Sequence, residues 1–188
     1  MLPGATLRYL LKKTVAMVGM MGAGKTAVGQ AVAERLKVAF RDSDEEIVAA
    51  SNMAIAEIFA RDGEAFFREK ETQIIERLLE SPPGILSTGG GAYLSETNRA
   101  LITEKGVAVW LKADLDLLWQ RVRHKNTRPL LQTDDPKATL KDLSIRREPS
   151  YQAADLAVET RAEFSIPETA TLVIEALLTR EDVLEVKR

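Results

Sequence analysis

The sequence predicts a three-layer α/β fold in which helices cover both faces of a parallel β-sheet. Short apolar strand patterns alternate with longer helical patterns along most of the chain, as in folds built from strand–helix–strand units. The first strand pattern is followed by a glycine-rich turn of the phosphate-binding type and then by a helix pattern. With 188 residues, of which 45% are hydrophobic, the chain is long enough for one domain with a sizeable core.

The composition excludes several classes of protein. The net charge of −2 provides no general basic surface for nucleic acid or anionic lipid, and no apolar run approaches the ~20 residues that span a bilayer. Residues 1–13 lack the apolar core and cleavage site of a secretion signal. The chain has no cysteine and a single histidine, His124, which excludes disulfides and metal sites built from several of these residues. We therefore expect a cytoplasmic protein that binds neither nucleic acid nor a membrane.

The chain contains no internal repeat and no low-complexity linker. We expect a single domain over residues 1–188, with a core at about 14–179, a loose N-terminal extension at 1–13 and a C-terminal extension at 180–188. No extended apolar face is left over once the core helices are placed, so a monomer is expected.

The first half of the chain opens with an apolar strand at residues 14–18, which contains the β-branched residues typical of a buried strand. A helix at 27–36 and a second strand at 38–41 come next. Helical periodicity then covers residues 44–51, 54–60 and 63–80. The last of these carries an apolar stripe and ends at Pro82-Pro83-Gly84.

The second half continues the alternation. Strands are predicted at residues 85–88, 107–111 and 154–159, and helices at 95–104, 114–123, 136–147 and 167–179, with a polar stretch at 124–136. Pro149 is expected to end the helix before it. In a parallel sheet, ligands bind beyond the carboxyl ends of the strands. The glycine-rich turn, the acidic residues after the second strand and the glycines after the third are therefore expected at one edge.

The glycine-rich turn, G-M-M-G-A-G-K-T at residues 19–26, has the G-x-x-x-x-G-K-[ST] spacing of a phosphate-binding loop. Its glycines let backbone N–H groups converge on an anion at the positive end of a helix. Lys25 is expected to reach the β- and γ-phosphates, and the Thr26 hydroxyl to ligate Mg²⁺. A plain glycine-rich turn with an exposed lysine is the alternative, which the complete motif between strand and helix disfavours.

Asp42 and Asp44 follow the second strand, where residues two apart point the same way. Next to a phosphate site, two carboxylates can hold the water shell of a metal and hydrogen-bond an acceptor hydroxyl. The alternative is that they cap the following helix. Proximity to the phosphate loop favours the functional interpretation.

Arginines and glycines provide further candidates. Arg68 and Glu71 lie three apart on one helix face, so a glutamate-held fork for a substrate carboxylate is possible, although this local spacing is more typical of a surface ion pair. Gly89-Gly90-Gly91 leaves the backbone bare for a ligand, and three glycines exceed what a turn needs.

The polar stretch at 124–136 is a candidate lid, in which Arg128 would stabilise charge on a transferred phosphoryl group. The usual interpretation of such a stretch is a loop of solvated charges. One of Arg146 and Arg147 is a candidate anion clamp, although positive charge at a helix C-terminus is the simpler explanation of this pair. His124 is expected to be a surface residue.

Together these motifs resemble the shikimate kinases, and the resemblance covers about residues 14–178. Its marks are residues 19–26, Asp42-Ser43-Asp44, Phe67-Arg68 with Glu71, Gly89-Gly90-Gly91, Arg128-Pro129-Leu130-Leu131, and Arg147 with Pro149 and Tyr151. The phosphate loop is common to many nucleotide-binding enzymes, whereas the rest of the set at these spacings is specific.

The resemblance implies a P-loop kinase fold like that of nucleoside monophosphate kinases, with five parallel strands in the order 2-3-1-4-5, a mobile lid at 124–136 and substrate-binding helices at about 43–80. It implies transfer of the γ-phosphoryl group of ATP, with Mg²⁺, to the 3-hydroxyl of shikimate in aromatic amino-acid biosynthesis. The catalytic residues would be Lys25, Asp44 and Arg128. The implied ATP-binding residues are Gly22, Ala23, Gly24, Lys25, Thr26, Ala27 and Arg128; the substrate-binding residues are Asp44, Arg68, Gly89, Gly90, Gly91 and Arg147; and the metal would be held by Thr26 and, through water, Asp42.

Further roles follow from the same resemblance. Glu71 would orient Arg68, while Ile55, Phe59 and Phe67 would form an apolar pocket wall. Either Arg121 or Arg123 would stack on adenine, and the stretch at 160–162 weakly resembles a loop at the adenine edge.

The alternatives are a gluconate kinase or a nucleoside monophosphate kinase of the same fold, or a nucleotide-binding module without catalysis. A nucleotide acceptor would not need Arg68 and Arg147 for a carboxylate. Gluconate does carry one, so only the ordered motif set disfavours it. An inactive module would be expected to have lost Lys25, Asp44, Arg68 or Arg128, and all four are present.

Overall fold

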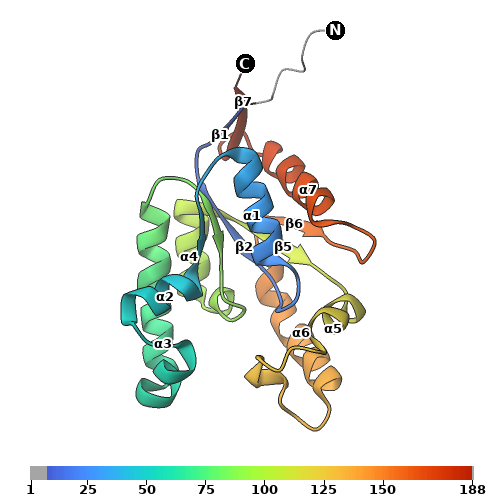
Figure 1. Cartoon of the computed structure of the whole chain (residues 1–188). Helices are drawn as coiled ribbons and strands as arrows, with labels where there is room; N and C mark the ends of the chain where they lie inside the picture. The colour runs from blue at the N-terminus through green and yellow to red at the C-terminus, as the bar shows by residue number, and fades with distance from the viewer. Residues whose placement is uncertain (1–7, 188) are drawn as a thin grey trace.

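The fold is built on a five-stranded parallel sheet (Figure 1). A computed structural model describes residues 8–187, so residues 1–7 of the expected N-terminal extension lie outside the described residues. The strands, in chain order, are β2 (Thr14–Val18), β3 (Phe40–Asp42), β4 (Ile85–Ser87), β5 (Gly106–Lys112) and β6 (Leu156–Glu159). Their order across the sheet is β3-β4-β2-β5-β6. This confirms the predicted order 2-3-1-4-5 and the three-layer α/β class.

Helices cover both faces of this sheet. The helices are α1 (Lys25–Leu36), α2 (Ser43–Ser51), α3 (Ile55–Glu80), α4 (Glu96–Lys105), α5 (Leu115–Val122), α6 (Pro136–Gln152) and α7 (Ile166–Leu178), with short 3₁₀ turns η1 (Ala92–Leu94) and η2 (Pro129–Leu131). The crossover through α1 runs from β2 outward to β3, whereas the crossover through α4 runs the opposite way, from β4 to β5. Because parallel crossovers are right-handed, α1 and α4 lie on opposite faces. Helix α7 packs beside α1, and α3 packs beside α4.

The core runs through the middle strands. All residues of β2 and β4 are buried, as are all residues of β5 except its last. Burial on both faces explains why these strands are continuous apolar runs rather than alternating patterns. Within residues 8–187, no helix combines the length and the apolar character needed to cross a bilayer.

Helix α3 contains a break at Gly63, whose φ of 84° and ψ of 171° are not helical. A positive φ of this size favours glycine, because a Cβ makes this backbone conformation costly. The sequence predicted separate helices at 54–60 and 63–80, and the break does fall at their junction. Ile58 before the break and Phe67 after it share one buried cluster with Ile47 of α2, and α3 also packs beside α4.

The predicted end of helix α6 at Pro149 is wrong, since the helix continues through Pro149 to Gln152. A proline inside a helix removes one backbone hydrogen bond. Here the last turn is held by Tyr151, whose side chain is buried and whose hydroxyl donates to the Gly90 carbonyl at 2.8 Å. A tertiary contact therefore overrides the local stop signal.

The chain ends also differ from the expectation of loose extensions. Strand β1 (Arg8–Leu11) pairs antiparallel with β7 (Leu184–Lys187) in a separate two-stranded sheet. Both strands lie side by side at one end of the molecule (Figure 1). Leu11 and Leu184 are buried in the main core, so these segments belong to the folded domain. Their short patterns carried too little signal to reveal a pairing across the whole length of the chain.

We predict that Leu184→Ala lowers the free energy of unfolding by about 2–5 kcal/mol, because it removes a buried side chain and leaves a cavity. Leu184 is 1% exposed, whereas Leu10, on the paired strand, is 37% exposed. Leu10→Ala is therefore the matched control and should change stability far less. Urea denaturation followed by circular dichroism would measure both. Equal stability of the two variants would show that β7 is not part of the core.

Candidate active site

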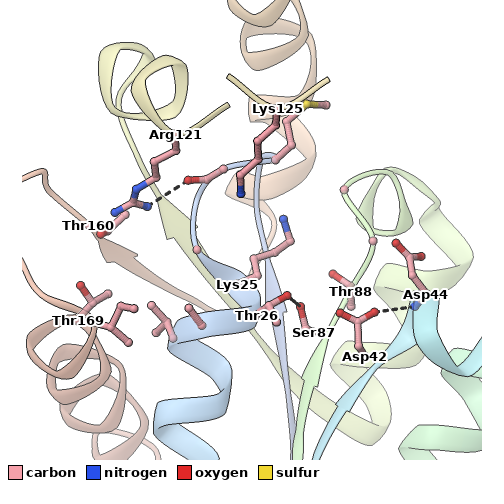
Figure 2. A pocket seen from close by; sticks show the side chains of 18 of the residues that line it. Lys25, Thr26, Asp42, Asp44, Ser87, Thr88, Arg121, Lys125, Thr160 and Thr169 are labelled. Carbon is pink, nitrogen blue, oxygen red and sulfur yellow. Dashed lines mark hydrogen bonds between the residues drawn. The ribbon is translucent and has the colours of Figure 1, made fainter. Parts of the chain in front are cut away.

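A cavity of about 500 Å³ opens at the carboxyl ends of the parallel strands (Figure 2). The predicted site residues that line it are Gly22, Gly24, Lys25, Thr26, Ala27, Asp42, Asp44, Gly89, Gly90 and Arg128. These residues come from the turn after β2, the ends of β3 and β4, and the segment between α5 and α6. The expected convergence at one edge of the sheet is therefore observed.

The phosphate-loop motif connects β2 directly to α1. Its backbone takes left-handed φ values of 143° at Gly19, 82° at Gly22 and 96° at Gly24. A Cβ at Gly22 would lie only 2.8 Å from Cγ1 of Val122, so both conformation and space require glycine there. The loop leads into the N-terminus of α1, where backbone N–H groups favour an anion.

Lys25 begins helix α1 and its ammonium lies against the loop. Nζ donates to the carbonyls of Gly19 at 2.8 Å and Met20 at 3.0 Å. Burial, followed by the positive charge of Arg128, lowers the pKa of Lys25 to about 8. The charged form is thus poorly stabilised by the protein alone, and a phosphate anion would favour it.

Asp42 and Asp44 both line the cavity. The sequence attributed this to their spacing of two residues at the end of one strand, and that reason is wrong. Asp42 ends β3 and caps helix α2, whereas Asp44 lies in the first turn of α2 rather than on the strand. Oδ1 of Asp42 accepts from the backbone N–H groups of Asp44 at 2.9 Å and Glu45 at 3.3 Å. Asp42 therefore caps α2 with one carboxylate oxygen, as the alternative interpretation expected. Burial, followed by the charge of Asp42, raises the pKa of Asp44, while Lys25 and Arg68 oppose this shift.

The three consecutive glycines make room for charged side chains. A Cβ at Gly89 would lie 2.8 Å from Oδ1 of Asp44, and a Cβ at Gly91 would lie 2.6 Å from Nη2 of Arg68. The carbonyl of Gly90 accepts from Nη1 of Arg147 at 3.2 Å. None of the three has a left-handed φ. Glycine is therefore needed here for space rather than for backbone conformation.

Arg68 and Glu71 form a partly buried ion pair, with Nη1 and Oε1 at 2.8 Å. The Glu71 side chain is only 1% exposed, so the surface ion pair that local spacing favoured is not what the structure contains. Burial raises the pKa of Glu71, while its hydrogen bond to Arg68 and the charge of that arginine oppose the shift. The pair holds the guanidinium against the segment Gly89-Gly90-Gly91, here called the glycine loop.

Arg147 reaches the same loop from α6, where the simpler explanation from sequence was a helix C-terminus. That explanation is wrong, because α6 continues for another five residues beyond Arg147, to Gln152. Helices α3 and α6 thus each bring one arginine to the loop. Arg68, Arg147 and Gly91 lie beside the cavity rather than among its lining residues.

The segment between α5 and α6 covers the phosphate side of the cavity. Arg128 and Lys125 line the cavity, and Leu131 anchors the segment in the core. Nε of Arg128 is buried and has no hydrogen-bond partner among residues 8–187. A buried guanidinium N–H without a partner is costly, so this arginine is suited to an anionic ligand. His124 is exposed, as expected.

Arg121, rather than Arg123, lines the cavity. Its Nη1 donates to the carbonyls of Gly22 at 3.1 Å and Ala23 at 3.0 Å, so it supports the phosphate loop in this structure (Figure 2). Arg123 is exposed. Of the two arginines that the sequence left open, Arg121 is therefore the one at the cavity. Its stacking on adenine stays a prediction.

Sequence reasoning assigned no role to several lining residues. They are Ser87 at the end of β4, Thr88 directly after it, Phe164 between β6 and α7, and Ile166 and Thr169 at the start of α7. The signal that could have found them is position, since each ends or follows a strand at the same edge of the sheet. Thr160, from the stretch compared with an adenine-edge loop, also lines the cavity.

The expected apolar pocket wall is not among the lining residues. Phe67 is 3% exposed and packs in a small core between α2 and α3. The ring of Phe59 lies 4.6 Å from it, and the Arg68 guanidinium lies 5.2 Å from the Phe67 ring centre. Phe67 therefore packs against the Arg68 guanidinium, and Phe59 packs against Phe67. Ala23, a predicted ATP-binding residue, is also absent from the cavity lining, because its side chain is fully buried in the phosphate loop.

The fold and the site together define a class of protein. A parallel sheet carries a phosphate loop after its central strand, two carboxylates after the edge strand β3 and an arginine-bearing segment over the cavity. This is the architecture of a P-loop kinase.

The chain belongs to the shikimate kinase family, whose model matches residues 21–178. It is 64% identical over 182 residues to a shikimate kinase from Cereibacter sphaeroides, covering 97% of this chain and 91% of that protein. A shikimate kinase from Ruegeria pomeroyi is 63% identical over 175 residues, covering 93% and 90%. The solved structure of a shikimate kinase from Acinetobacter baumannii, in complex with shikimate, matches with a TM-score of 0.84 at 35% identity, covering 90% and 94%. The family assignment made from the motifs is confirmed.

The lowered pKa of Lys25 predicts a pH dependence of nucleotide binding. Above pH 8 the free protein loses the Lys25 proton, so binding of ATP must take the proton up again. The dissociation constant of ATP should therefore rise between about pH 8 and 9.5, approaching tenfold per pH unit. Calorimetric titration across this range would measure it. Lys25→Arg keeps its charge, so its dissociation constant should be nearly independent of pH, and equal slopes for both proteins would contradict the assignment.

Proposed function

We propose that this chain transfers the γ-phosphoryl group of ATP to the 3-hydroxyl of shikimate, giving shikimate 3-phosphate for aromatic amino-acid biosynthesis. The observation that carries the proposal is the convergence of the phosphate loop, Asp44 and two arginines at one end of the sheet. Membership of the shikimate kinase family supports the same reaction. We further propose that the chain acts as a monomer in the cytoplasm.

The phosphate donor would bind over the loop at the N-terminus of α1. Backbone N–H groups from Gly22 to Ala27 would hold the β- and γ-phosphates. Lys25 would exchange its two carbonyl acceptors for phosphate oxygens, and Arg128 would gain the partner that its Nε lacks among residues 8–187. Both cations would then neutralise charge that spreads over the transferred group.

The residues beside the loop fit a hydrated Mg²⁺. Thr26 is an exposed residue at the start of α1, and its hydroxyl makes only a long contact of 3.4 Å with Oγ of Ser87. Asp42 uses only Oδ1 for capping, which leaves Oδ2 for a metal-bound water. Mg²⁺ prefers oxygen ligands and usually retains several waters. Held there by Thr26 and Asp42, the ion would supply positive charge that offsets the negative charge of the phosphates.

The acceptor would bind between α3 and the glycine loop. Arg68 and Arg147 would grip its carboxylate, a geometry for which a planar guanidinium is well suited. Asp44 would accept a hydrogen bond from the attacking hydroxyl and take up its proton as the new phosphorus–oxygen bond forms. The raised pKa of Asp44 makes its carboxylate a stronger proton acceptor.

An assay of ADP release with three acceptors tests the proposal most directly. Turnover is expected with shikimate, with ATP and Mg²⁺ both required, and only background rates with gluconate and AMP. The reason is that AMP offers no carboxylate to Arg68 and Arg147, and the motif set disfavours gluconate. Absence of turnover with shikimate, together with turnover on either other acceptor, would overturn the assignment.

A glycine substitution tests the proposed carboxylate grip. In Gly91→Ala the new Cβ would lie 2.6 Å from Nη2 of Arg68 and must displace the guanidinium. We expect the KM for shikimate to rise about tenfold or more, with the KM for ATP nearly unchanged, since small misplacements of binding groups are costly. Gly90→Ala is the control, because its Cβ would meet nothing closer than Nη1 of Arg147 at 3.5 Å. Equal KM values for shikimate in the two variants would contradict the placement of Arg68.

A further inference from the structure

Asn98 is a buried amide that has no role in the site described so far. It lies in the first turn of α4 and is only 1% exposed. Its side chain makes two hydrogen bonds to different elements. Nδ2 donates to the carbonyl of Ala92 at 2.9 Å, and Oδ1 accepts from the hydroxyl of Thr72 at 2.8 Å.

The orientation of this amide is determined by its partners. A carbonyl oxygen can only accept, so the amide NH₂ group must face Ala92. The carbonyl oxygen of Asn98 must then face Thr72, whose hydroxyl can donate. Aspartate, leucine or alanine cannot make both hydrogen bonds in this arrangement at neutral pH. The site therefore specifies asparagine.

The two partners of Asn98 are neighbours of the residues that hold Arg68. Thr72 follows Glu71, which pairs with Arg68 at 2.8 Å. Ala92 follows Gly91, against which the Arg68 guanidinium lies. The Asn98 bridge thus links α3, which carries Arg68 and Glu71, to the residue directly after Gly91. The bridge therefore spans the two elements, α3 and the segment at residues 89–92, between which the Arg68 guanidinium lies.

We propose that Asn98 is a positioning residue for the carboxylate-binding arginine. It acts through the distance between α3 and the glycine loop and does not touch the substrate. This inference rests on the proposed function, because it assigns Arg68 to the shikimate carboxylate.

Asn98→Asp provides the test, since it changes one hydrogen-bonding group without changing the shape of the side chain. A carboxylate still accepts from Thr72 but repels the Ala92 carbonyl, whereas a protonated carboxyl donates to it. At pH 8 we expect the KM for shikimate to rise about tenfold, with the KM for ATP unchanged, as for loss of one buried hydrogen bond. Because burial beside a carbonyl favours the protonated carboxyl, lowering the pH should move the KM for shikimate toward that of the unmodified protein. A residue that serves only stability would not produce this reversible pH profile.

Two further variants separate positioning from stability. Ser95→Ala removes only the cap of α4, a hydrogen bond from the Asn98 backbone N–H at 3.3 Å. It should lower the melting temperature without changing the KM for shikimate. Thr72→Val should raise that KM at every pH, and Thr72→Ser should restore it.

The outcomes distinguish this inference from the proposed function. If the unmodified protein phosphorylates shikimate and Arg68→Ala raises the KM for shikimate, the proposed function stands. If Asn98→Asp then shows the KM of the unmodified protein at pH 8, or raises the KM for ATP as much as that for shikimate, the positioning role of Asn98 is wrong.

Discussion

The site depends on one steric constraint: the backbone after β4 must carry no side chains. At Gly89 and Gly91 a single Cβ would lie within 3 Å of Asp44 and Arg68, respectively. Between them, the carbonyl of Gly90 accepts hydrogen bonds from Arg147 and Tyr151. This bare segment lets one carboxylate and two arginines, from three different helices, approach the end of the central strands. Asp44, Arg68 and Arg147 can converge here because this segment carries no side chains.

The second general feature is the balance of charge around the cavity. The pKa of Lys25 is lowered and that of Asp44 is raised, in both cases chiefly by burial. The charged forms of both groups are therefore destabilised before any ligand binds. Phosphate would stabilise the charged lysine, and an acceptor hydroxyl would engage the carboxylate. Both pKa shifts therefore suit the proposed binding of an anionic phosphate donor and the proposed transfer of a proton from an alcohol.

The predictions from sequence were wrong where a contact between residues far apart in the chain outweighed a local sequence pattern. Proline rules predicted that α6 ends at Pro149, yet the buried Tyr151 carries the helix past it. Local spacing favoured a solvated pair for Arg68 and Glu71, yet the glutamate is buried. The pairing of β1 with β7 joins segments at opposite ends of the chain. Each of these outcomes depends on residues far away in sequence, which no local pattern contains.

The sequence by itself determined the fold class, the strand order implied by the family resemblance and the identity of nearly all the candidate site residues. It could do so because apolar periodicity and the phosphate-loop glycines are local properties that constrain the backbone directly. Only the tertiary structure decided why the three glycines are needed, which of Arg121 and Arg123 lines the cavity, and that Asn98 bridges α3 to the glycine loop. These features are distances between elements, and they exist only once the sheet has brought those elements together.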